Sequence, residues 1–208
     1  MRRALPLLLS LAACGPAHVD PAAVKALPLE ARLDLLEAEN DLFVAVDAVD
    51  EAAARAEEAR EEYRLAGRRI DEAEAVLEQG EQKKDARQVE IARLSVQEAQ
   101  QRKEFLDLWR DVELGRLRAE KARLALAEAR LERRRAQAVK RANLPGSEKL
   151  ELRVFDEQTA RLEREAKLRA EEAARAEKDA EALRAGWNAT RAQLAKKTGG
   201  GQGSPWVE

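Results

Sequence analysis

The sequence predicts an all-α protein in which long antiparallel helices form an elongated three-helix coiled-coil bundle. Charged residues make up 38% of the 208 residues and aromatic residues only 3%, a balance typical of long helices rather than of an ordinary globular core. Apolar residues recur with a seven-residue period over three stretches of the chain. A Pro-Gly pair at 145–146 separates the second stretch from the third, because neither residue continues a helix readily.

The first stretch predicts a helix over residues 28–79. One row of large residues takes every seventh position, and a row of alanines lies three positions further on. The rows are Leu35, Leu42, Val49, Ala56, Tyr63, Ile70 and Leu77, and Ala38, Ala45, Ala52, Ala59, Ala66 and Ala73. A seam with alanine along one row lets a neighbouring helix approach closely, so we expect tight packing here.

The second and third stretches predict helices over residues 82–142 and 147–197. The second carries one seam from Ile91 to Ala129 and another stripe on a different side, formed by Leu117, Leu124, Leu131 and Ala138. The third shows two rows, which include Phe155, Leu162, Ala166, Ala173, Ala180, Trp187 and Leu194. Two apolar stripes on one helix need two neighbouring helices, which favours three helices packed together. Trp109 and Trp187 are expected to be core contacts within this packing.

Two breaks between helices are predicted. Asn143, Leu144, Pro145, Gly146 and Ser147 form a turn, in which Ser147 can cap the following helix. The other break is expected near Gly80, at the position of a helix C-terminal glycine, and Asp85 with Gln88 has the spacing of a capping box.

The alternative to a break near Gly80 is one very long helix over 28–142, about 170 Å in length, with a helical hairpin return. The seven-residue phase runs through Gly80 unbroken and supports this alternative. A cut at Gly80, however, gives three helices of similar length that can pair end to end. The length match favours the three-helix bundle.

The first residues are typical of a secretion signal. Arg2 and Arg3 precede an apolar run over 4–13, and small residues then lead to Cys14, the single cysteine. The run is about half the length that a membrane-spanning helix needs. We therefore interpret residues 1–13 as a signal peptide, and residues 14–27 as a short Pro-containing tether.

Leu11, Ala12, Ala13 and Cys14 resemble the lipobox of bacterial lipoproteins. The resemblance implies that a diacylglycerol, with palmitate-type chains, is attached to Cys14 and that the mature chain starts there. Two or more acyl chains hold a protein stably on a membrane. Gly15, where an aspartate signals retention in the inner membrane, implies the outer membrane, facing the periplasm. The Ala-rich helical region is similar, at the level of composition, to DUF4398-type envelope lipoproteins.

The residue types exclude most chemistry. His18 is the sole histidine and lies in the tether, and a lipidated Cys14 leaves no free thiol, so we expect no catalytic residues, no cofactor and no metal site. Lys and Arg total 38 against 40 Asp and Glu, in mixed order, which predicts no nucleic-acid partner. A basic run is interpreted as the cationic end of the second helix. It comprises Arg130, Arg133, Arg134, Arg135, Lys140 and Arg141.

These observations predict a non-enzymatic, lipid-anchored protein of the bacterial cell envelope, a helical rod that acts as spacer or scaffold. It would bind the membrane through the lipid on Cys14, and other envelope proteins or itself, but no small-molecule substrate. The alternative is an accessory subunit of a secretion, efflux or wall-synthesis complex. Its candidate partner contacts are the turn at Asn143, Leu144, Pro145 and Gly146, and Trp206 in the Gly-rich tail over 198–208.

Overall fold

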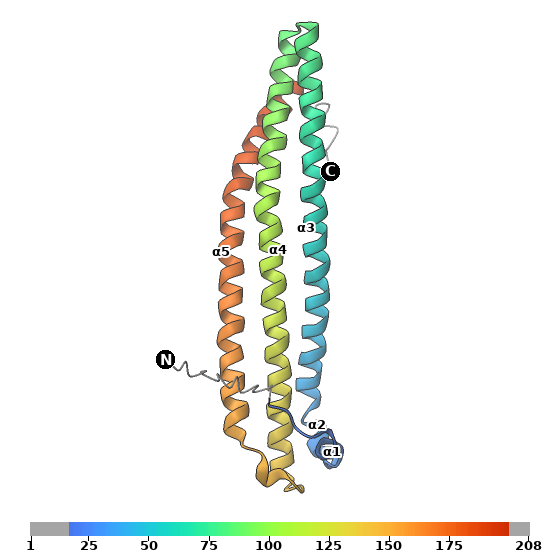
Figure 1. The fold of residues 1–208 in the computed structure, drawn as a ribbon, viewed down its shortest axis with the longest axis vertical. Helices are drawn as coiled ribbons and strands as arrows, with labels where there is room; N and C mark the ends of the chain where they lie inside the picture. Colours follow the sequence, from blue (N-terminus) through green and yellow to red (C-terminus); the bar gives the residue numbers. More distant parts are fainter. Residues whose placement is uncertain (1–16, 200–208) are drawn as a thin grey trace, which may run out of the picture.

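A computed structural model describes residues 17–199 and confirms the all-α fold class (Figure 1). Three long helices, α3 (Leu36–Lys83), α4 (Ala86–Arg141) and α5 (Leu152–Thr198), run antiparallel as an elongated bundle. Two short helices, α1 (Pro21–Lys25) and α2 (Leu29–Leu33), precede them, and the 3-10 helix η1 (Ser147–Lys149) lies between α4 and α5. We refer to the end that carries α1, α2 and η1 as the base, and to the opposite end, where α3 meets α4, as the tip.

The chain reverses between α3 and α4, so the single helix over 28–142 is wrong. The reversal lies four residues after Gly80, however, and Gly80 is a buried residue inside α3. Lys84 takes the left-handed conformation at φ 56°, and the N–H groups of Lys84 and Asp85 bond to the carbonyls of Glu81 and Gly80. This is a Schellman ending with lysine in the usual glycine position. The predicted cap on α4 is confirmed, because Asp85 Oδ1 accepts a hydrogen bond of 3.0 Å from the Gln88 N–H.

The predicted turn between α4 and α5 is present, but its last residue has a different role. Asn143 is left-handed at φ 48° and Gly146 at φ 86°, which ends α4 and turns the chain. Ser147 is buried in η1 and does not cap α5, which begins five residues later at Leu152 with no side-chain cap. The expected start at 147 is therefore wrong, because the chain needs η1 and an extended Leu150 to cross from α4 to α5.

Helix α4 lies between α3 and α5 and packs along both (Figure 1), as its two apolar stripes predicted. No comparable packing joins α3 to α5 in the described part of the chain. The alanine row of α3 contains Ala52, Ala59 and Ala66, which are all buried, and Ala56 of the other row is buried as well. Small side chains at these positions bring α3 close to α4.

An aromatic cluster fills the middle of the bundle, where all three helices contribute. The rings of Phe105 and Trp187 stack with centroids 5.7 Å apart, and Phe105 also stacks on Trp109 at 5.8 Å. Tyr63 of α3 packs against the same buried cluster. Trp109 and Trp187 are therefore core contacts, as expected. Two grooves lie between α3 and α5, one toward the tip and one toward the base from this cluster.

Candidate functional site

The first described residues are packed onto the base of the bundle. Val19 is only 1% exposed, and Leu27 and Leu35 are buried with it. These three side chains pack against a cluster from α4 and α5 that includes Val139 and Phe155. The interpretation of residues 14–27 as a tether is therefore wrong for 17–27. This segment folds because its apolar residues cover the ends of α4 and α5, which would otherwise be open to water.

Hydrogen bonds fix the same segment to two different helices. The N–H of Ala17 donates to Gln158 Oε1 of α5 and that of Val19 to Glu132 Oε2 of α4, each over 2.8 Å. Nδ1 of His18 lies 3.1 Å from Glu132 Oε2. Arg135 holds the other oxygen of Glu132 at 2.8 Å, so this carboxylate is fixed from two sides. The chain is thus held firmly from Ala17 onward.

The candidate partner contacts predicted from sequence fall in two places. Asn143, Pro145 and Gly146 are exposed at the base, whereas Leu144 is half-buried and packs on the cluster around Val139. They are therefore accessible on the same end of the bundle as residues 17–27. Cys14 and Trp206, the other two predicted sites, lie outside the described residues.

Three of the six residues of the basic run form ion pairs between helices, so the run does not serve only the end of α4. Arg130 and Arg133 bind carboxylates of α5, at 3.0 Å to Glu163 and 2.5 Å to Asp156. Arg135 reaches Glu39 of α3 at 3.6 Å. Only Lys140 and Arg141 lie in the last turn of α4, where positive charge complements the helix dipole.

One buried carboxylate connects all three long helices. Glu113 of α4 is 3% exposed and accepts a hydrogen bond of 2.5 Å from Arg116, while Arg55 of α3 lies 3.7 Å from its other oxygen. Arg116 also binds Glu177 of α5 at 2.6 Å. Burial lowers the pKa of Arg116, but the hydrogen bond to Glu177 and the charges of Glu113 and Glu177 together outweigh burial and raise it. Arg116 is therefore a permanent cation, and this network is structural.

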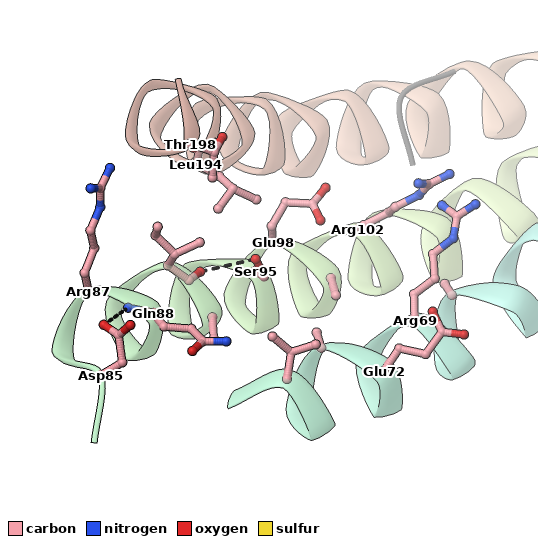
Figure 2. Close-up of a pocket in the computed structure, with 16 residues that line it drawn as sticks. Arg69, Glu72, Asp85, Arg87, Gln88, Ser95, Glu98, Arg102, Leu194 and Thr198 are labelled. Carbon is pink, nitrogen blue, oxygen red and sulfur yellow. Dashed lines mark hydrogen bonds between the residues drawn. The ribbon is translucent and has the colours of Figure 1, made fainter. Parts of the chain in front are cut away.

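A groove of about 650 Å³ runs along the tip half of the bundle, between α3 and α5 with α4 as its floor (Figure 2). We call it the upper groove. Its apolar surface comes from Ala66, Ala73 and Val76 of α3, Ile91 and Ala92 of α4, and Leu194 of α5. Figure 2 shows Arg69 and Arg102 at one end of the groove and Asp85 and Arg87 at the other. Small side chains on two helices leave room for the groove, namely Ala66 and Ala73 of α3 and Ala92 and Ala99 of α4.

Residues 17–199 contain no group of three or more His, Cys, Asp or Glu side chains that could hold a metal ion. Within the same range, no helix is long and apolar enough to cross a membrane.

The chain matches no known protein-family model, no curated protein and no solved structure. Its candidate sites are therefore identified from its own residues and their contacts. Sequence reasoning missed two of them: the packing of residues 17–27 on the base, and the upper groove. The first had no periodic signal, because Val19, Leu27 and Leu35 are eight residues apart rather than seven, and the seven-residue row of Leu35 falls on Pro28 and Pro21 in this segment.

Proposed function

We propose that this chain is a lipid-anchored structural or interaction protein of the bacterial cell envelope, in which the helical bundle serves as a spacer or scaffold. The lipid would be carried by Cys14, in the sequence Leu11-Ala12-Ala13-Cys14 that resembles a lipobox. The observation that carries the proposal is the closeness of that cysteine to the folded base. Only two residues separate Cys14 from Ala17, whose N–H is bound to α5.

This closeness would control how the bundle stands relative to a membrane. The three chain steps from Cys14 to Ala17 span at most about 11 Å, so a lipid on Cys14 would keep the base beside the membrane. The 56 residues of α4 extend for about 84 Å at 1.5 Å per residue. The tip, where α3 meets α4, would then stand at a fixed distance from the membrane. A long flexible tether would leave that distance undefined. Spacing of this kind suits a non-enzymatic role in the envelope.

The experiment that tests the anchor compares Cys14→Ser with Ser10→Ala. Cells expressing each full chain are labelled with radioactive palmitate, and their membranes are washed with carbonate. We expect the unchanged chain and Ser10→Ala to carry the label and to stay with the membrane, because Ser10 lies in the apolar run and contributes no thiol. Cys14→Ser should lose the label and appear in the soluble fraction.

A Cys14→Ser chain that stays membrane-bound, or an unchanged chain without label, would overturn the anchor. The scaffold role is tested separately by cross-linking the labelled chain in cells and purifying it in detergent. Recovery of envelope proteins or of a second copy supports a scaffold. A single multisubunit machine in fixed stoichiometry would instead favour the accessory-subunit alternative.

A further inference from the structure

We propose that the upper groove is the binding site for the chain's own C-terminal segment, with the indole of Trp206 seated between α3 and α5. The groove holds about 650 Å³ and has a predominantly apolar lining. Within residues 17–199, the three helices line this space and no side chain occupies it. Pro205, Trp206 and Val207 form an apolar sequence in the segment that follows α5.

The position of the end of α5 makes this segment the nearest occupant. Leu194 and Thr198, in the last two turns of α5, form part of the groove wall (Figure 2). Gly199 follows in the left-handed conformation at φ 81°, which directs the chain away from the helix axis. Trp206 is seven residues beyond Gly199, a reach of up to about 25 Å. The groove extends from Arg87 to Arg102 on α4, about 22 Å at the helical rise.

The groove and the segment are also complementary in charge. Arg87 and Arg102 line opposite ends of the groove, and the Nε atom of Arg102 is buried without a hydrogen-bond acceptor. Two of the carboxylates there are already engaged: Asp85 caps α4, and Glu98 accepts from the Trp187 indole at 2.5 Å. Glu72 is the third acidic residue of the lining. Glu208, two residues after Trp206, adds the carboxylate that Arg87 or Arg102 would bind.

The second groove between α3 and α5 provides an internal control. It lies toward the base, is lined by Ala45 and Ala48 of α3, and has a similar volume of about 620 Å³. Ala45 and Ala73 occupy the same row of α3 and are both half-buried. They are 28 residues apart, about 42 Å along the helix. The C-terminal segment can therefore reach Ala73 but not Ala45.

Tryptophan fluorescence is the first test. The contribution of Trp206 is the difference between the emission of the full chain carrying Cys14→Ser and the emission of the same chain with Trp206→Ala. We expect that difference to be shifted to shorter wavelength and to be protected from acrylamide. Filling the groove by Ala73→Leu should move the Trp206 emission to the wavelength of an exposed indole. Circular dichroism checks that helix content is unchanged. A solvent-like Trp206 contribution in the unfilled chain overturns the proposal.

Disulfide trapping is the second test and locates the segment. In the full chain with Cys14→Ser, Val207→Cys is paired with either Ala73→Cys or Ala45→Cys, and both proteins are oxidised mildly at low concentration. We expect an intramolecular disulfide with position 73 and none with position 45. Equal trapping at both positions, or disulfide-linked dimers in place of the intramolecular product, overturns docking of the segment in its own groove.

Discussion

The backbone N–H of Val19 donates a hydrogen bond of 2.8 Å to Oε2 of Glu132, although the two residues are 113 positions apart in the chain. The same Val19 side chain is among the three largest fully buried side chains of the described part of the molecule. Val19 is therefore held at the base both by a backbone hydrogen bond and by the burial of its side chain. This arrangement makes residues 17–27 part of the bundle and determines where any lipid on Cys14 would hold it.

Val19→Asp should release residues 17–27 from the base without unfolding the long helices. A carboxylate at this site would be buried in the apolar cluster around Val139 and Phe155, where burial of a charge is strongly unfavourable. We expect limited proteolysis to cut before α3 much faster than in the unchanged chain, while circular dichroism at low temperature stays the same.

The control for this prediction is Leu29→Asp. Leu29 is 63% exposed and lies in the first turn of α2, where a carboxylate complements the helix dipole. Its cleavage pattern should match that of the unchanged chain. Equal cleavage of the two variants would mean that Val19 does not hold the segment.

The chain offers a matched pair of phenylalanines that tests the aromatic cluster. Phe105 is 7% exposed and stacks on Trp187, whereas Phe43 is 70% exposed on α3. Phe105→Ala should lower the free energy of unfolding by about 3–5 kcal/mol, and Phe43→Ala by less than about 0.5 kcal/mol. Urea unfolding followed by circular dichroism measures both. Similar losses for the two variants would contradict the core assignment.

Much of the fold could be predicted because helix packing repeats along the sequence. The alanine row from Ala38 to Ala73 and the two stripes of the second helix contain the information that α4 lies between two neighbours. Asp85 could be assigned as a cap because its spacing to Gln88 is local. Periodicity could not show how α3 and α5 sit relative to each other, since that depends on side chains from three helices that meet around Phe105. The upper groove was therefore not predictable.

The two breaks show where local signals mislead. Gly80 has the residue type of a helix end, but it lies where α3 approaches α4, and a Cβ there would meet Val89 Cγ2 at 3.4 Å. Lys84 has no preference for the left-handed region, yet it takes that conformation because Asp85 starts the next helix. Pro21 lies in the segment predicted as a tether, whereas it begins the short helix α1, and Pro28 is the N-cap of α2. This segment is folded because Val19 and Leu27 are buried against α4 and α5. Such packing between distant parts of the chain cannot be read from the local sequence.

Glu113→Gln should weaken the contact between all three long helices. The amide keeps the shape of the side chain but removes the charge that faces Arg55 and Arg116 in a buried site. We expect a loss of about 1–3 kcal/mol in the free energy of unfolding. Glu57→Gln is the control, because Glu57 pairs with Arg60 at 2.9 Å on an exposed surface. Its midpoint in urea should stay within experimental error, and a loss equal to that of Glu113→Gln would argue against a buried network.

Lys84→Gly should stabilise the protein, whereas Lys83→Gly should destabilise it. Lys84 holds φ 56°, a conformation that costs an L-residue with a side chain roughly 1–2 kcal/mol and costs glycine almost nothing. Lys83 is the last residue of α3, where glycine lowers helix stability by up to about 1 kcal/mol. Thermal unfolding should therefore shift upward for Lys84→Gly and downward for its neighbour. Because the chain reverses only if residue 84 is left-handed, a decrease in the unfolding temperature for Lys84→Gly would mean that α3 and α4 join in a different way at the tip.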